Sequence, residues 1–270
     1  GVAAVVRTPK FKLMLNEAAD LIQAPAAWAA LGGEPGAGAG IKIGIIDTGI
    51  DPNHPAFADE SLASPAGFPK ARPEDLAFTS NKIIVARSYV AMLSSALPEF
   101  SRPDDFSPRD RIGHGTAVAM IAAGGSVTSP QGTLTGIAPQ AYLGNYKIFG
   151  SADINDFSSG DAVITAIDDA VLDGMDIISI SFGAVAQYPF DEQGDGCFAE
   201  PDILCDPVAM AAQSAMEEWG VVVVAAAGNA GARGEQRFPA LNSIATPGSA
   251  AAVITVGASA YPRVIDFERM

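Results

Sequence analysis

The chain has 270 residues, 49% of them hydrophobic and 17% charged, which is enough for one large globular domain or for a domain with a small appendage. Its formal net charge of -15 argues against nucleic acid as a partner, because a nucleic-acid binder needs a basic face that neutralises phosphates. The longest purely apolar run, residues 221–227, is far too short to span a bilayer.

The N-terminal part of the chain has the composition of an appendage. Residues 1–15 alternate like an extended segment, and residues 16–31 have the apolar spacing of a short amphipathic helix. Residues 32–40 form a linker rich in Gly and Pro. We therefore expect the main domain to occupy residues 41–270.

The rest of the chain alternates between apolar runs of strand length and segments with helical spacing. Strands are predicted over residues 41–46, 82–90, 141–149, 176–182, 221–227 and 251–258. Helices are predicted over residues 115–124, 161–174 and 207–220, and the remainder of residues 52–110 is expected to form surface loops. This alternation predicts an α/β protein with a mostly parallel sheet and helices on its faces.

Two residues of this pattern are suited to acid–base chemistry. Asp47 directly follows the first apolar strand, so its carboxylate is expected at the edge where parallel sheets bind ligands. His114, one of only two histidines, has glycine on both sides and begins a predicted helix. An imidazole serves as a general base near neutral pH and needs a carboxylate to fix its tautomer. The alternatives are a capping Asp47 and a purely structural His114.

A third polar residue follows a later strand. Asn229 stands among small residues after the run 221–227, where its amide could donate a hydrogen bond into a site. The alternative is a turn asparagine that tolerates a left-handed backbone. The segment Ser179–Gly183 ends another strand in small residues, as a backbone that pairs with an extended ligand would.

The two cysteines, Cys197 and Cys205, enclose a short loop that contains proline. They form either a disulfide, which would indicate an oxidising compartment, or a free pair. Without a nearby histidine they do not make a zinc site, and no metal site is predicted. The acidic loop Phe190–Gly196 is either a source of calcium ligands or a solvated loop.

Taken together and in this order, several blocks resemble the signature blocks of subtilisin-like serine proteases, the subtilases of peptidase family S8. They are "DTGID", "GHGTAVAMIAAG", "GIAP", "AIDDAVLDGMDIISISFG", "VVVVAAAGNAG" and "AAVITVGA". The resemblance covers residues 41–258. It implies a three-layer α/β/α subtilisin-like fold and an endopeptidase that hydrolyses peptide bonds in proteins, without a required cofactor but with structural calcium in many members.

The resemblance also implies roles for individual residues. Asp47 would orient the imidazole, His114 would be the general base and then the general acid, and Asn229 would be the side-chain donor of the oxyanion hole. His54 would be a structural loop residue. Six further residues would bind an extended peptide: Ser181, Phe182 and Gly183 beside its backbone, and Ala226, Ala227 and Gly228 around the side chain that precedes the scissile bond.

The same resemblance sets expectations for partners and location. Residues 1–15 resemble the last strand of an inhibitory prodomain, with an ordinary N-terminal strand as the alternative. The full-length protein would then interact with its own prodomain and with extended protein or peptide substrates. It would be secreted or displayed at the cell surface.

The chain departs from the family pattern at the nucleophile. A "GTS" block that opens an apolar helix is expected after Asn229, and the sequence contains none; the serines after it are Ser243, Ser249 and Ser259. Three explanations stay open: a fragment of a longer protease, inactive by itself; a serine-less homologue that binds peptides; or an unexpected nucleophile such as Ser249. In the first case we expect the missing helix to leave apolar surface exposed and to favour self-association.

Overall fold

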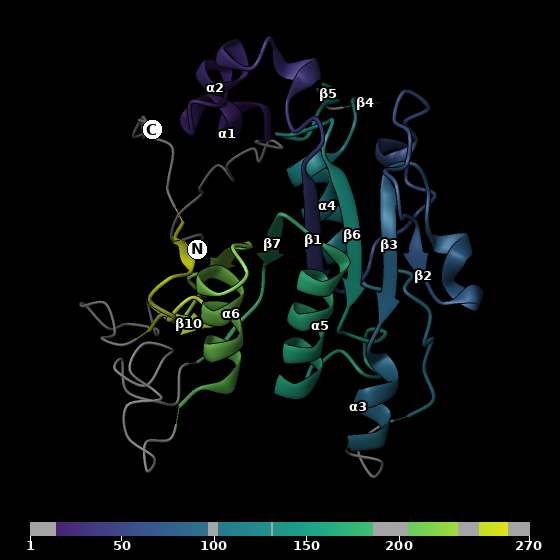
Figure 1. Cartoon of the computed structure of the whole chain (residues 1–270), viewed down its shortest axis with the longest axis vertical. Helices are drawn as coiled ribbons and strands as arrows, with labels where there is room; N and C mark the ends of the chain where they lie inside the picture. Colours follow the sequence, from purple (N-terminus) through teal and green to yellow (C-terminus); the bar gives the residue numbers. More distant parts are fainter. Residues whose placement is uncertain (1–14, 97–101, 131, 186–204, 232–242, 259–270) are drawn as a thin grey trace, which may run out of the picture.

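A computed structural model of the chain describes residues 15–96, 102–130, 132–185, 205–231 and 243–258. Its centre is a seven-stranded sheet in the order β11-β9-β7-β1-β6-β3-β2, in which all neighbouring strands are parallel (Figure 1). The strands are β1 (Lys42–Asp47), β2 (Lys70–Ala71), β3 (Ile83–Ser88), β6 (Tyr142–Lys147), β7 (Ile177–Ile180), β9 (Val222–Ala226) and β11 (Ile254–Val256). The predicted α/β fold with a mostly parallel sheet is confirmed.

The predicted helices form close to their expected bounds, as α4 (His114–Ala123), α5 (Gly160–Asp173) and α6 (Pro207–Glu217). The start of α6 is fixed by the Asp206 carboxylate, which accepts from the backbone N–H groups of Val208 and Ala209 at 2.9 and 3.2 Å. The end of α5 is fixed by Gly174 in the left-handed conformation, with φ 81°.

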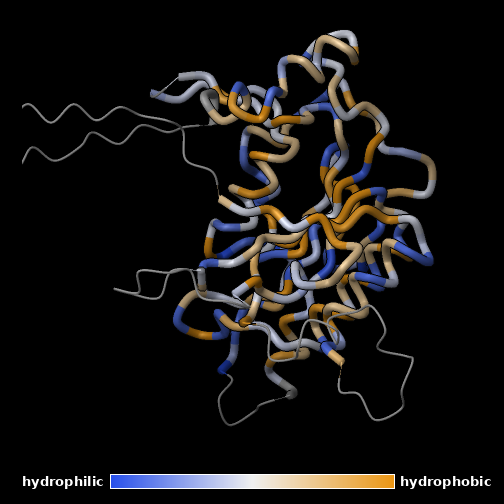
Figure 2. Tube along the Cα trace, turned by 90° about the vertical axis from the view of Figure 1, so that its left-hand side faces the viewer, coloured by the Kyte–Doolittle hydropathy of each residue, from blue (hydrophilic) through white to orange (hydrophobic). Residues whose placement is uncertain are grey.

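The two faces of the sheet are covered by different helices. Strand register aligns Ile46 with Ile180 and Ile180 with Ala225, and these side chains belong to the cluster under α5 and α6. Residues an odd number of positions away along a strand point to the opposite face, where Ile43 of β1 and its neighbour Leu143 of β6 pack with α4. Figure 1 shows α5 and α6 side by side in front of the sheet with α4 behind it, and Figure 2 shows the hydrophobic residues converging on the middle of the molecule.

Part of the α4 face of the sheet has no covering element among the described residues. Its apolar side chains come from the β9 and β11 end, where Val222, Ile254 and Val256 are 36%, 51% and 54% exposed. Strand β9 buries its other face fully, as at Val223 and Ala225.

The N-terminal helix differs from its prediction. In place of one helix over residues 16–31, the chain forms two short helices, α1 (Leu15–Leu21) and α2 (Ala24–Ala30). Gln23 between them takes a left-handed conformation with φ 59°, and Pro25 stands in the first turn of α2. A proline there lacks the N–H that a continuous helix would need, so the helix ends and restarts.

Several smaller elements were not predicted. Residues 52–110 contain, besides β3, the edge strand β2, the helix α3 (Val90–Ala96) and two 3-10 turns, Pro55–Phe57 and Pro73–Phe78. Two two-stranded sheets pair β4 (Val127–Ser129) with β5 (Gly132–Leu134) and β8 (Ala184–Val185) with β10 (Ala245–Thr246). These elements are too short to leave a periodic pattern in the sequence.

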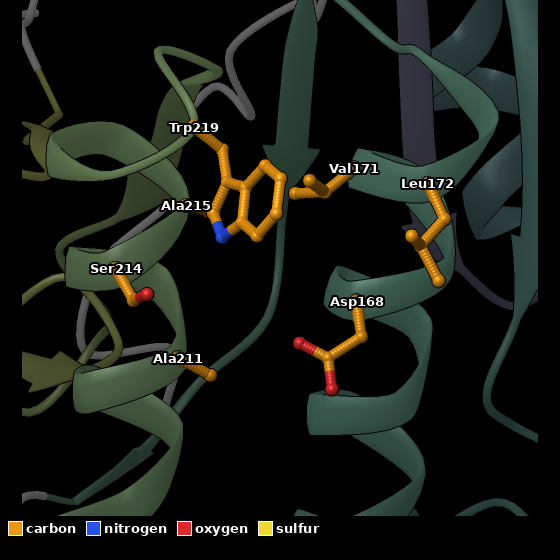
Figure 3. A pocket seen from close by; sticks show the side chains of 7 residues that line it. All are labelled: Asp168, Val171, Leu172, Ala211, Ser214, Ala215 and Trp219. Carbon is orange, nitrogen blue, oxygen red and sulfur yellow. The ribbon is translucent and has the colours of Figure 1, made fainter.

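A shallow cavity of about 260 Å³ lies between α5 and α6 on the surface (Figure 3). The indole of Trp219, just after α6, lies between the two helices and points toward Val171 of α5. Leu172 and Asp168 of α5 and Ser214 of α6 also line this cavity.

Within the described ranges, none of the helices combines the length and the apolar character that a membrane span requires.

Candidate active site

Asp47 is the last residue of β1 and its carboxylate is almost fully buried, with 1% of the residue exposed. Its Oδ1 accepts a hydrogen bond from the backbone N–H of Thr48 at 2.7 Å, and Oδ2 has no hydrogen-bond partner among the described residues. Burial raises the pKa of Asp47 above its ordinary value, although the hydrogen bonds from His114 and Thr48 act in the opposite direction. A buried carboxylate of this kind favours a cationic or hydrogen-donating neighbour.

His114 provides that neighbour from the first residue of α4. Its Nδ1 lies 2.7 Å from Oδ1 of Asp47, while 53% of its side chain remains exposed. Because the carboxylate oxygen accepts, the neutral imidazole carries its proton on Nδ1 and leaves the lone pair of Nε2 free. The sequence-based pairing of Asp47 with His114 agrees with this geometry.

The glycines around His114 allow two backbone segments to approach closely. Gly113 has φ 97°, a conformation in which a side chain is strained. A Cβ on Gly115 would lie only 2.3 Å from the carbonyl oxygen of Gly49 and 3.1 Å from Cβ of Asp47. The first turn of α4 therefore rests directly on the loop after β1, and this contact brings the imidazole to the carboxylate.

The strand register brings the other predicted site residues to the same edge of the sheet. Ile46 is level with Ile180 of β7, and Ile180 is level with Ala225 of β9. Asp47 and the residues that follow β7 and β9 therefore stand in one row across three adjacent strands, which are spaced about 4.8 Å apart. This row was predicted only in general terms, as the ligand-binding edge of a parallel sheet.

The residues after β7 and β9 enclose one cavity of about 880 Å³. All six predicted substrate-binding residues and Asn229 line it: Ser181, Phe182, Gly183, Ala226, Ala227, Gly228 and Asn229. Gly183 and Gly228 face Ala245 so closely that a Cβ on either would lie 2.7 or 2.8 Å from Cβ of Ala245. The small residues thus let three chain segments meet and keep the cavity open.

Other predictions have different outcomes. His54 accepts a hydrogen bond from the backbone N–H of Ala56 at 3.3 Å and contacts Phe57, which agrees with a structural role. Ser249 lies in a turn and does not open a helix. Cys205 is not a free thiol, but Cys197 and the loop 190–196 lie outside the described residues, so the disulfide between the cysteines and the calcium site stay predictions.

Sequence reasoning missed a carboxylate close to the pair. Asp110, four residues before His114, is buried and accepts hydrogen bonds from Thr48 and Thr116 at 2.9 and 2.6 Å. The signal was present in the sequence, since "DRIGHGT" places an aspartate before a helix start and a threonine within its first turn. Because Asp110 ends the polar segment 52–110, the sequence pattern assigned it to a surface loop.

Comparison with known proteins extends these observations. Residues 38–267 match the Subtilase family, Peptidase_S8. The chain belongs to the subtilase family. Among curated relatives from Arabidopsis thaliana, Subtilisin-like protease SBT1.9 is 40% identical over 205 residues, which cover 72% of this chain and 26% of that protein. Subtilisin-like protease SBT2.3 is 34% identical over 88% of this chain and 27% of that protein.

A third relative, the CO(2)-response secreted protease of Arabidopsis thaliana, is 30% identical over 87% of this chain and 29% of that protein. This subtilase chain therefore spans about a quarter of the length of the curated relatives it matches.

No group of three or more His, Cys, Asp or Glu side chains arranged for a metal ion occurs within the described ranges.

Proposed function

We propose that this chain is part of a serine endopeptidase of the subtilisin type, which hydrolyses peptide bonds in proteins. The observation that carries the proposal is the 2.7 Å hydrogen bond between the buried carboxylate of Asp47 and the half-exposed imidazole of His114. A carboxylate that holds Nδ1–H leaves Nε2 ready to accept a proton from a nucleophile. Membership of the subtilase family supports the same reaction.

In the proposed reaction, Nε2 of His114 takes the proton of a serine hydroxyl as the serine oxygen attacks the peptide carbonyl carbon. Asp47 stabilises the imidazolium that forms, without itself taking the proton. When the C–N bond breaks, His114 gives the proton to the leaving amine nitrogen. A water molecule then attacks the acyl-enzyme in the same way and releases the acid product.

The cavity beyond β7 and β9 is the proposed substrate cleft. The side-chain amide of Asn229 donates a hydrogen bond to the carbonyl oxygen as it becomes an oxyanion. The backbone of residues 181–183 pairs with an extended peptide, and residues 226–228 border the side chain that precedes the scissile bond. No cofactor takes part in these steps, and calcium at the loop 190–196 stays a prediction.

We place the nucleophilic serine outside these 270 residues, so that the chain alone is inactive. Two observations support this placement. The described serines after Asn229 are Ser243 in a loop and Ser249 in a turn, whereas the family nucleophile opens a helix. The exposed apolar face of β9 and β11 is on the same side of the sheet as α4, which itself contacts β1 and β6, so a further helix has apolar surface to cover there. The alternative is a non-catalytic peptide-binding or scaffold protein on the same fold.

Labelling with a fluorophosphonate probe, read by peptide mass spectrometry, tests the proposal. The 270-residue chain and the product of the complete gene are compared, each with and without His114→Ala. His54→Ala is the matched control, because His54 is the other histidine and only caps a turn. We expect label only on the complete protein, at a serine outside this chain, lost with His114→Ala and retained with His54→Ala. Absence of label on both proteins would favour the binding protein, and label at Ser243, Ser249 or Ser259 would refute the placement of the nucleophile.

Location and partners follow from the same proposal. An extracellular location is supported by the similarity to a secreted protease. A prodomain of the same protein is a proposed partner, together with protein substrates in extended conformation. We also expect the isolated chain to self-associate through the exposed side chains of Val222, Ile254 and Val256, which a strictly monomeric particle in analytical ultracentrifugation would contradict.

A further inference from the structure

Asp110 has every acceptor position of its carboxylate engaged. Oδ1 accepts from Thr48 Oγ1 at 2.9 Å and from the backbone N–H groups of Ile112 and Gly113 at 2.9 and 2.8 Å. Oδ2 accepts from the backbone N–H and the hydroxyl of Thr116 at 3.0 and 2.6 Å. Ionised carboxylates only accept hydrogen bonds, so all five groups must donate to it.

This requirement fixes the direction of two threonine hydroxyls. The hydroxyl of Thr48 donates to Asp110 and therefore has a lone pair for the backbone N–H of Gly115, which lies 2.8 Å away in α4. The hydroxyl of Thr116 likewise donates to Asp110 and accepts from the backbone N–H of Asp51 at 3.0 Å. Each hydroxyl thus joins the loop after β1 to the first turn of α4. Thr48 of the loop accepts from α4, and Thr116 of α4 accepts from the loop.

These two joints lie on either side of the reactive pair. Thr48 follows Asp47 and donates its backbone N–H to the same Oδ1 that faces His114. Gly115 follows His114 and is held by the Thr48 hydroxyl. Loss of the orientation of that hydroxyl would free both neighbours of the pair, although neither Asp47 nor His114 contacts Asp110 by a hydrogen bond among the described residues.

Asp110 is itself held by side chains of the central strand β6. Lys147 donates from Nζ to the carbonyl oxygen of Arg109 at 2.7 Å, and Asn145 donates from Nδ2 to that of Pro108 at 2.9 Å. Both side chains are buried in the sheet. Burial raises the pKa of Asp110, but its hydrogen bonds from Gly113, Thr116 and Ile112 outweigh this effect and keep the pKa below its ordinary value. The acceptor is therefore ionised and rigidly placed.

We propose that Asp110 is a positioning residue, which acts through the hydroxyls of Thr48 and Thr116 to hold the imidazole of His114 at hydrogen-bonding distance from the carboxylate of Asp47. The inference rests on the proposed function for its catalytic consequence. Its geometric content can be tested without turnover, because it concerns the tautomer and the proton of His114 alone.

The test uses the 270-residue chain labelled with ¹⁵N and follows the two imidazoles by NMR. Thr48→Val removes the hydroxyl at nearly constant volume, and Thr48→Ser restores it. Asp110→Asn keeps the shape of Asp110 but replaces an acceptor by a donor. Asp75→Asn, at another buried aspartate near the β2 edge of the sheet, is the matched control. Far-UV circular dichroism and the amide spectrum report whether each variant is folded.

We expect His114 in the unchanged chain, and in Thr48→Ser and Asp75→Asn, to be a single Nδ1–H tautomer. In Thr48→Val and Asp110→Asn the Nδ1 proton should exchange about tenfold faster, the factor that corresponds to the net value of one hydrogen bond. If Asp110→Asn does not fold, the comparison of Thr48→Val with Thr48→Ser decides the test. Unchanged tautomer and exchange in folded Thr48→Val would overturn the inference alone. Absence of the Nδ1–H tautomer in the unchanged chain would overturn both the inference and the proposed function.

Discussion

Replacement of Gly115 by alanine should separate α4 from the loop after β1. The new Cβ would lie 2.3 Å from the carbonyl oxygen of Gly49, well inside van der Waals contact. The Gly49 backbone is itself in close contact with Pro108 and Asp110, at 2.6 and 2.9 Å from a Cβ built on it. The strain must therefore be relieved by moving the first turn of α4, which carries His114.

The expected size follows from two opposing effects. Overpacking a buried position costs about 1–3 kcal/mol, and the upper value applies because the atom that Cβ meets is backbone. Replacing a helical glycine by alanine returns about 1 kcal/mol. The free energy of unfolding of Gly115→Ala should thus fall by about 2 kcal/mol relative to the unchanged chain.

Urea unfolding followed by circular dichroism measures this difference, and Gly160→Ala is the matched control. Gly160 begins α5, and a Cβ there would meet only Val208 Cγ2 at 3.5 Å, an ordinary contact. We expect that variant to gain about 0.4–1 kcal/mol, because alanine restricts the unfolded chain. An equal or higher stability of Gly115→Ala, at unchanged denaturant slope, would refute the argument that α4 rests on the Gly49 backbone.

Three further predictions concern buried and site residues. Asp47→Asn should lower turnover by the complete protein by about 10⁴-fold, because the amide favours the wrong histidine tautomer. Since the folded-state pKa of Asp47 is raised, the unchanged chain should lose stability relative to Asp47→Asn as pH rises from about 3.8. A free energy of unfolding, measured in urea, that instead rises with pH relative to Asp47→Asn would contradict this. Asn229→Ala should lower kcat by about 10²–10³ with little change in KM; a change confined to KM would instead indicate a role in binding. The Nζ of Lys82 donates to the Pro139 carbonyl, and burial lowers the pKa of Lys82 to about 8. The free energy of unfolding should therefore rise by about 3 kcal/mol between pH 8 and 10.5 relative to Lys82→Met. Parallel dependence of the unfolding free energy on pH in the two proteins would refute this.

Much of the sheet could be predicted because its signal is local. The run before Asp47 is apolar without interruption, as expected for a strand buried on both faces, and the structure buries five of the six residues of β1. Helices α5 and α6 combine helical spacing with a glycine or proline at a terminus, and both form within a few residues of the predicted bounds. The prediction of one N-terminal helix was wrong because it gave the apolar spacing of residues 16–31 more weight than Pro25, whose missing N–H ends one helix and starts the next.

The candidate site likewise has features that the sequence could predict and features that it could not. The residue types left structural alternatives open for Asp47, His114 and Asn229, and the resemblance of the ordered motifs to the subtilase signature blocks identified them as site candidates. The sequence could not supply the 2.7 Å contact of the first two, which depends on Gly115 meeting Gly49 across the fold. The sequence shows Asp110 and Thr116 near a helix start, but the contact of Asp110 with Thr48 forms only when α4 packs on β1.

The sequence by itself determined the alternation of strands and helices, the family and the reactive residue types, because periodicity and motifs are properties of neighbouring residues. Only the tertiary structure decided the strand order, the row from Asp47 through Ser181 to Ala226, and the exposed apolar face beyond β9. These features depend on pairings between residues that lie from 15 to 134 positions apart in the sequence. Such pairings are selected by packing of the whole domain, which no local pattern records.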